Sequence, residues 1–150
     1  MRENIGKYRG QRKNNRERVY GYYCQGRGKS AYIFDMYRLG KSCSCCDSCD
    51  CPYDSIEASQ VHKVIPETVG QHTGRNDKNG TESYHGDICS YKDDSGTAQK
   101  GIIRWSLCQT KFYFEAIGGD DEGNQDGDLD REFEVIGNIH DNPELLEKAT

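Results

Sequence analysis

The sequence predicts a mainly β protein, a meander of short strands that closes into a small barrel or roll and ends in a short C-terminal helix. Two observations favour this fold class. Short segments rich in tyrosine, valine, isoleucine and phenylalanine alternate with clusters of glycine, aspartate, asparagine and serine. Only 33% of the 150 residues are hydrophobic, and tyrosine is common among them, so we expect a thin core.

The N-terminal region, residues 1–64, is expected to hold a β-hairpin and a third strand. The hairpin joins KYRG, residues 7–10, to RERVYGYY, residues 16–23, because Asn14 and Asn15 tolerate the positive φ of a turn. A further strand follows at SAYIFDM, residues 30–36. From residue 37 to residue 59 the alternation is lost, which indicates a cysteine-rich loop that leaves the sheet.

The C-terminal region, residues 65–150, is expected to form the barrel. Pro66 interrupts strand pairing, and the Asn-Gly pair in DKNG, Asp77 to Gly80, favours a type I′ hairpin turn. A helix is expected to start at Asn142 as N-cap, with Pro143 at its first position and Glu144 in its first turn. Strands are predicted at YHGDICSY (84–91), GIIRWSL (101–107), KFYFEAI (111–117) and FEVIGNI (133–139).

Four stretches carry a recognisable signature. They are VYGYY at 19–23, IPETVGQHTGRNDKNG at 65–80, YHGDI at 84–88 and EVIGNIHDNPELL at 134–146. In this order they resemble the YopX-like family of phage and prophage proteins, over nearly the whole chain. The resemblance implies an SH3-like β-barrel in the C-terminal part, formed by the strands after Asp87. It implies a phage or prophage accessory protein, and it carries over no catalytic or binding residue.

The glycines and the aspartate within these stretches are expected to be architectural. Asp87, directly after a glycine, is placed to accept hydrogen bonds from nearby backbone amides. The glycines fall at expected strand ends or turns, where a side chain would be sterically costly; they are Gly70, Gly74, Gly80, Gly86 and Gly137.

Charge is divided between the two ends of the chain. The first 18 residues carry seven Lys or Arg and two Glu, a net charge of +5 (7 − 2). Residues 115–150 carry twelve Asp or Glu and two basic residues, a net charge of −10 (2 − 12). This asymmetry favours head-to-tail self-association, or a basic arm that contacts nucleic acid.

We therefore expect a non-enzymatic protein-interaction or self-assembling module, with a protein partner and a homo-oligomeric state. The alternative is nucleic-acid binding by the basic hairpin, since Lys and Arg side chains bind phosphates and aromatic rings stack on bases. Tyr8 is a further aromatic residue of the basic hairpin. The candidate residues for nucleic-acid or partner binding are Arg9, Arg12, Lys13, Arg16, Arg18, Tyr20 and Tyr22.

A third hypothesis is a small metal-binding protein built on the cysteine-rich loop. Its candidate ligands are Cys43, Cys46, Cys49 and Cys51. Their spacing partly matches the ferredoxin motif C-x2-C-x2-C-x3-C-P, but the last interval has one residue where the motif has three. Zinc fits better, with a remote partner such as His62, although structural zinc sites usually join two separated pairs of ligands. The competing interpretation is an exposed loop of reduced thiols, so the expectation is no cofactor, with zinc as the alternative.

The acidic loop, residues 119–130, resembles an EF-hand calcium loop from residue 122 onward, but Phe133 stands where the bidentate glutamate is needed. For catalysis, a Cys89–His85 pair could be drawn, yet eight cysteines and four histidines make such a pair expected by chance. No enzyme activity is expected. The N-terminus lacks an apolar segment and no apolar run approaches a membrane span, so we expect a protein of the bacterial host cytoplasm.

Overall fold

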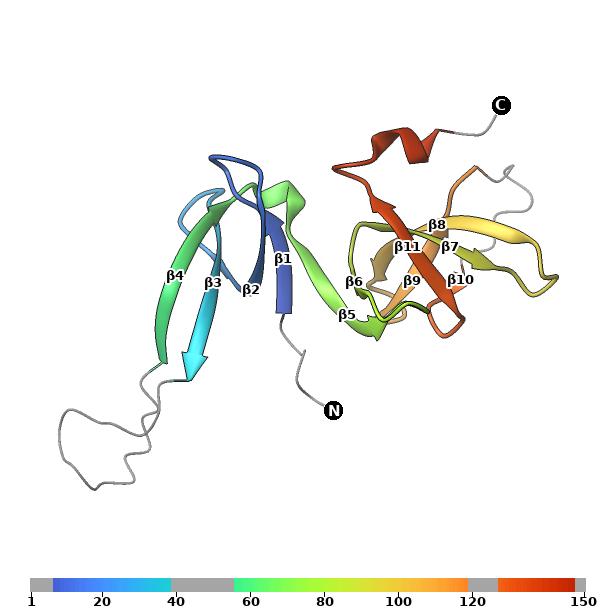
Figure 1. Cartoon of the computed structure of the whole chain (residues 1–150), viewed down its shortest axis with the longest axis horizontal. Coiled ribbons are helices and arrows are strands. Elements are labelled where there is room, and N and C mark those ends of the chain that lie inside the picture. The colour runs from blue at the N-terminus through green and yellow to red at the C-terminus, as the bar shows by residue number, and fades with distance from the viewer. Residues whose placement is uncertain (1–6, 39–55, 119–126, 148–150) are drawn as a thin grey trace, which may run out of the picture. The chain divides into compact units, whose positions relative to one another are not determined.

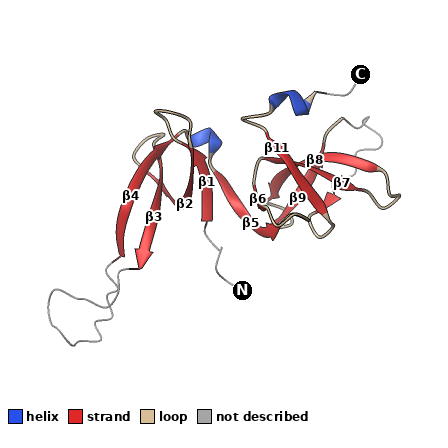
Figure 2. Cartoon of the chain, in the orientation of Figure 1, coloured by secondary structure: helices blue, strands red, loops and turns tan. Residues whose placement is uncertain are grey.

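The computed structural model of the chain describes residues 7–38, 56–118 and 127–147 (Figure 1). Two antiparallel sheets dominate this part of the chain, and its only helices are two short 3-10 turns (Figure 2). The chain divides into two compact units, Gly6–Val69 and Gly70–Thr150. No helix within the described ranges is long and apolar enough to cross a membrane. The predicted mainly β class is confirmed.

The first unit contains four strands that pair in the order β4-β3-β2-β1, each antiparallel to its neighbour. The end of the sheet curls back on itself, because Ile65 N–H donates to Gln11 O (2.9 Å) and Lys13 N–H donates to Lys63 O (3.0 Å). Its buried core is small and consists of Ala31, Ile33 and Val64. The elements are β1 (Lys7–Gln11), β2 (Arg18–Gln25), β3 (Ala31–Arg38), β4 (Ile56–Val64) and the 3-10 turn η1 (Pro66–Thr68).

The predicted N-terminal hairpin is confirmed, with a different turn. The residue with positive φ is Arg16 (φ 60°), and neither Asn14 nor Asn15 has one. The Asn15 side chain accepts a hydrogen bond from Glu17 N–H (3.0 Å), so the asparagine bends the backbone through its side chain and the next residue takes the left-handed conformation.

The second unit holds a five-stranded antiparallel sheet in the order β10-β9-β8-β7-β11, preceded by the β5–β6 hairpin. The expected C-terminal barrel takes the form of a curled half-barrel around stacked and edge-on aromatic rings, among them Tyr91, Phe114 and Phe133. Its strands are β5 (Gly70–Asn76), β6 (Glu82–Tyr84), β7 (Asp87–Lys92), β8 (Ala98–Ser106), β9 (Lys111–Ala116), β10 (Gly127–Asp128) and β11 (Phe133–Asn138).

Two turns of the second unit share one local structure. In DKNGT, residues 77–81, and DDSGT, residues 93–97, the aspartate Oδ1 accepts hydrogen bonds from the amides two and four residues later. The glycine has φ of +83° in the first turn and +84° in the second. The expected type I′ turn is therefore wrong: Asn79 has no positive φ, because the Asp77 carboxylate fixes the turn instead.

Two further expectations need correction. The stretch 84–91 is not one strand, because Gly86 (φ +90°) separates β6 from β7 and Asp87 Oδ2 accepts from Tyr84 N–H (2.9 Å), as expected for that aspartate. The C-terminal helix is a 3-10 turn, η2 (Pro143–Leu146). The Asn142 side chain makes no cap hydrogen bond; its Nδ2 donates to Glu144 Oε1 (3.2 Å).

Candidate functional site

The first unit presents a face that is both basic and aromatic. On neighbouring antiparallel strands, paired residues point to the same side of the sheet. Lys7 pairs with Tyr22 and Arg9 with Tyr20, while Tyr22 pairs in turn with Phe34 on β3. We call this outward side the basic aromatic face; it comprises Lys7, Arg9, Arg18, Tyr20, Tyr22, Tyr32, Phe34, Val61 and Lys63.

The opposite side of the same sheet is packed, which fixes the orientation of the face. Val19 and Tyr23 alternate with the exposed residues of β2 and pack on the core, together with Tyr8 of β1. Tyr8 and Tyr23 lie with ring centroids 5.3 Å apart. Tyr8 therefore belongs to the core and cannot contact a ligand beside the outward tyrosines.

Rings and cations are interleaved on the basic aromatic face. Tyr20 and Tyr22 are 41% and 44% exposed. The Tyr22 ring lies beside that of Phe34, with centroids 6.2 Å apart. The Lys7 ammonium lies 5.8 Å from the centre of the Tyr20 ring. Such a surface offers flat apolar faces for stacking and positive charge for phosphate at the same place.

Only part of the predicted candidate set lies on this face. Arg9, Arg18, Tyr20 and Tyr22 do. The other three candidates lie in or beside the β1–β2 turn, where Arg12 forms an ion pair with Glu17 (3.3 Å); they are Arg12, Lys13 and Arg16. The rest of the face was not predicted as site residues; it consists of Lys7, Tyr32, Phe34, Val61 and Lys63. The alternation in AYIF, residues 31–34, could have indicated Tyr32 and Phe34.

A pocket of about 340 Å³ lies in the second unit. Its apolar part is formed by Trp105 and Phe112, paired across β8 and β9 with ring centroids 4.9 Å apart and nearly perpendicular, and by Leu129. The remaining lining residues are Thr73, Arg75, Lys111, Asp128 and Asp130. A pocket of this size with an aromatic part suits one side chain or a small planar group.

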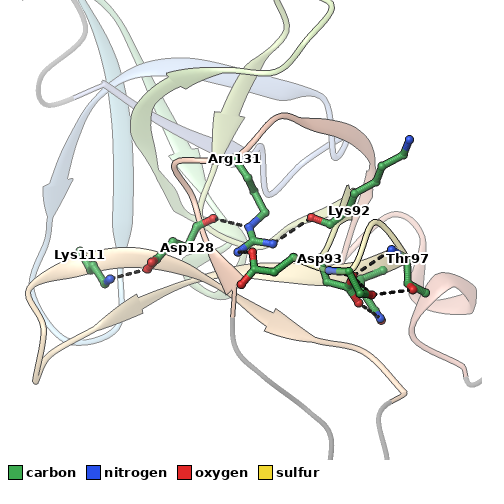
Figure 3. Close-up of polar contacts among 9 residues, drawn as sticks. Lys92, Asp93, Thr97, Lys111, Asp128 and Arg131 are labelled. Atoms are coloured by element: carbon green, nitrogen blue, oxygen red, sulfur yellow. Dashed lines mark hydrogen bonds and ion pairs between the residues drawn. The ribbon is translucent and has the colours of Figure 1, made fainter.

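Ion pairs on the pocket's polar rim join segments that are distant in sequence. Arg75 of β5 donates to Asp130 (3.1 Å), and Lys111 of β9 pairs with Asp128 of β10 (2.5 Å). Figure 3 shows Lys111 and Arg131 reaching Asp128, the lysine at its carboxylate and the arginine at its main-chain oxygen (3.2 Å). Lys111 holds the pKa of the Asp128 carboxyl below its ordinary value, through a hydrogen bond and its charge. The rim thus carries two cations and two carboxylates.

Arg131 also fixes β10 and the following turn to the rest of the sheet. Its guanidinium donates to Lys92 O (2.9 Å) and forms an ion pair with Asp94 (3.4 Å). Figure 3 shows this arginine between Asp128 and Lys92. It lies 5.5 Å from the centre of the Tyr91 ring. This side of the pocket therefore has a defined position, although β10 is only two residues long.

The proposed metal ligands Cys43, Cys46, Cys49 and Cys51 lie outside the described residues, as does loop 119–126 of the calcium hypothesis. Within the described ranges, no group of three or more His, Cys, Asp or Glu residues is arranged to hold a metal ion. His62, the suggested remote zinc partner, is half-buried in β4.

The Cys89–His85 pair has a poor environment for catalysis. The Cys89 side chain is fully buried in the half-barrel core. Burial, followed by the charges of Asp87 and Asp77, raises the pKa of its thiol far above the ordinary value. Burial, followed by the nearby Arg104 and His140, lowers the pKa of His85. A thiolate nucleophile needs a lowered thiol pKa, so Cys89 is a core residue.

The fold has a relative among solved structures. The crystal structure of protein EF1440 from Enterococcus faecalis matches with a TM-score of 0.57 and 23% identity, over 94% of this chain and 97% of that chain. No functionally curated protein matches this sequence. The family model described as YopX protein matches residues 7–147, which includes both sheets. The resemblance noted in the sequence is therefore confirmed: the chain belongs to the YopX protein family.

Proposed function

We propose that the protein is a non-enzymatic binding module and that its first unit binds single-stranded nucleic acid on the basic aromatic face. The observation that carries this proposal is the cross-strand register, which places Tyr20 and Tyr22 beside Lys7 and Arg9 on the unpacked side of the sheet. Exposed tyrosines within a basic surface suit a strand whose bases are free to stack. In a duplex the faces of the bases are stacked on one another, so a duplex would contact only the Lys and Arg side chains.

The charge distribution supports the same ligand. Residues 1–69 carry twelve basic and eight acidic residues, a net charge of +4 (12 − 8), whereas residues 70–150 carry eight and seventeen, a net charge of −9 (8 − 17). The two values sum to the chain's net charge of −5. A polyanion is thus attracted to the first unit and repelled by the second, which directs it to one surface.

The size of the salt effect follows from the number of cations on the face. Four basic side chains lie there, namely Lys7, Arg9, Arg18 and Lys63. With a slope of about −0.7 per neutralised phosphate on a single strand, four contacts give a slope of about −3 in log affinity against log salt. Raising salt from about 50 to 200 mM should then weaken binding about 50-fold.

The test is fluorescence anisotropy of a labelled single-stranded oligonucleotide of about 15 nucleotides, titrated with protein under reducing conditions. Tyr22→Ala should weaken binding by roughly 1–3 kcal/mol, about 5- to 150-fold, because one stacking surface is removed. Arg9→Ala should lower the salt slope by about 0.7. Duplex of the same sequence should bind more weakly, and its affinity should change little with Tyr22→Ala.

The matched controls lie in the second unit. Trp105→Ala removes an exposed aromatic ring, and Lys92→Ala removes an exposed cation; neither should change the affinity. Equal losses in the controls and in the face variants would contradict the proposal, because they would indicate unspecific attraction. Binding that is absent at 50 mM salt would also contradict it.

The second candidate function is a protein interface in the second unit, and the pocket beside Trp105 favours it. Trp105 is 42% exposed, and aromatic side chains of this kind are enriched where protein partners dock. This candidate corresponds to the interaction or self-assembling module expected from the sequence. It uses a surface other than the basic aromatic face, so one chain can carry both functions.

A further inference from the structure

Four aromatic side chains form a continuous row across the basic aromatic face. Tyr20 and Tyr22 lie two residues apart on β2, which places their Cα atoms about 6.7 Å apart. The Tyr22 ring lies 6.2 Å from that of its β3 partner Phe34. Tyr32 precedes Phe34 by two residues, so it points to the same side of β3. The row thus passes from β2 to the neighbouring strand β3 and crosses the sheet diagonally (Figure 1).

A basic side chain lies at each end of this row. Arg18 precedes Tyr20 by two residues on β2, and both residues are exposed. At the other end, Lys63 of β4 pairs with Tyr32 and is exposed. From the rise along the strands and the spacing between them, the distance from Arg18 to Lys63 is about 22 Å. The row therefore offers a phosphate contact at both ends and ring faces between them.

The ring nearest Lys63 is held by the turn between β2 and β3. A Cβ on Gly26 would lie 2.6 Å from Tyr32 Cε2, so the Tyr32 ring packs directly on the backbone of this glycine. Gly26 N–H donates to Ser30 O (2.9 Å), which closes the turn. Tyr32 is half-buried, so part of its ring is open to solvent. A ring that is fixed before binding loses little conformational entropy when a base stacks on it.

We infer that this face binds a continuous unpaired stretch of about four nucleotides along the diagonal from Arg18 to Lys63, with one base on each ring of the row. The inference rests on the proposed function, because it specifies the ligand of the same face. A single strand whose bases stack on separate rings is extended to roughly twice the 3.4 Å per nucleotide of a duplex strand. The spacing along the row is close to this value, so each step suits one nucleotide.

Two straight paths over the same face are less favourable. A strand that follows β2 alone passes Tyr20 and Tyr22 but then reaches Cys24, which offers no ring. A strand that crosses the sheet directly from Tyr22 passes Phe34 and then reaches Val61, an aliphatic residue. Of the three paths, the diagonal is the one that meets a ring at every step and a basic side chain at both ends.

The test varies the number of bases at constant charge. Each ligand is a labelled strand of about 15 nucleotides with a central run of thymines and abasic sites at all other positions. Runs of two, three, four and six thymines leave the phosphates unchanged. In anisotropy titrations at low salt, the affinity should rise about 3-fold or more with each added base up to four. The step from four to six should add no more than about 3-fold, the gain from additional registers.

Variants at the Lys63 end of the row separate the diagonal from the path along β2. Tyr32→Leu removes a stacking ring and should weaken binding of the four-thymine strand about 3-fold or more. The two-thymine strand should change by less than about 2-fold, because two bases fit on Tyr20 and Tyr22. Tyr32→Phe keeps the ring and should bind both strands as wild type does. Lys63→Ala should lower the salt slope by about 0.7, whereas Lys92→Ala in the second unit should not change it.

Three outcomes would overturn the inference. The affinity could stop rising before four thymines, Tyr32→Leu could leave the four-thymine strand unchanged or weaken both strands equally, or Tyr32→Phe could lose as much affinity as Tyr32→Leu. If Tyr22→Ala still weakens binding in these cases, the proposed function stands and stacking is confined to β2. If Tyr22→Ala changes the affinity of no strand, the proposed function itself fails.

Discussion

Replacing Asp77 with asparagine tests how the second unit is held together. Asp77 is 7% exposed. Its Oδ1 accepts from Asn79 N–H (2.8 Å) and Thr81 N–H (2.9 Å), and its Oδ2 accepts from Val135 N–H of β11 (3.0 Å). An asparagine can keep the Oδ1 contacts, but it has an NH₂ group in the place of Oδ2. Two N–H donors, this group and the amide of Val135, then face each other, and the hydrogen bond between the turn and β11 is lost.

The magnitude follows from these contacts. A hydrogen bond to a charged group contributes about 1.5–3 kcal/mol, and leaving its partner unsatisfied in a buried site costs about 1–3 kcal/mol. The two energies partly count the same loss and cannot simply be added, so Asp77→Asn should lower the free energy of unfolding by about 2–4 kcal/mol. Asp93→Asn is the matched control, because Asp93 makes the same turn but its Oδ2 accepts from the Gln99 side chain, which water can replace.

The assay is urea unfolding at neutral pH with reductant, followed by the emission of Trp105, which lies in the same unit. The reasoning would be refuted if Asp77→Asn changed the free energy of unfolding by less than about 0.5 kcal/mol, a typical surface effect. It would also be refuted if Asp93→Asn cost as much. In that case the turn alone, and not its bond to β11, would account for the loss.

The same residue predicts a pH dependence. Burial raises the pKa of Asp77, but the backbone hydrogen bonds from Val135, Thr81 and Asn79 outweigh it, so the pKa lies below its ordinary value of 3.8. The ionised form is favoured by folding, so its contribution is complete above the unfolded-state pKa and is lost as pH falls through the folded-state pKa. The difference between wild type and Asp77→Asn should therefore shrink below about pH 4.

Three further predictions concern packing. Gly70→Ala should destabilise the second unit by about 2 kcal/mol or more, seen as a lower urea midpoint, because its Cβ would lie 2.4 Å from the carbonyl oxygen of His85. Ile33→Ala should cost about 2–5 kcal/mol and unfold the first unit preferentially, as measured by hydrogen exchange, because Ile33 is fully buried in a small core. Alkylation of the native protein, mapped by mass spectrometry, should label exposed Cys24 and spare buried Cys89.

The strands and turns were largely determined by the sequence. Alternating aromatic and β-branched residues predicted β2, β3, β7, β8, β9 and β11 close to their observed positions. Glycine placement marked the turns, as at Gly80 and Gly86, which both have positive φ. These features depend on hydrogen bonds and steric limits within a few residues, so they are present in the local sequence.

Details at the ends of elements depended on competing local contacts. The sequence placed a positive φ at Asn14 or Asn15, whereas the Asn15 side chain transfers it to Arg16 by binding Glu17 N–H. It predicted a helix after Asn142, but only the 3-10 turn η2 forms. A segment this short gains too few hydrogen bonds to complete an α-helix.

Both candidate surfaces were decided by tertiary structure. Tyr8 and Tyr20 are alike in the sequence, yet Tyr8 packs on the core beside Ile33 while Tyr20 faces solvent, because packing against β3 and β4 fixes which side of the hairpin is covered. The pocket joins Arg75 of β5, Trp105 of β8 and Asp128 of β10. Residues far apart in the chain meet there only after the sheet has curled. The sequence by itself thus determined which segments become strands and where they turn, since those choices depend on neighbouring residues. Which side chains share a face or a pocket depends on long-range packing and was decided only by the tertiary structure.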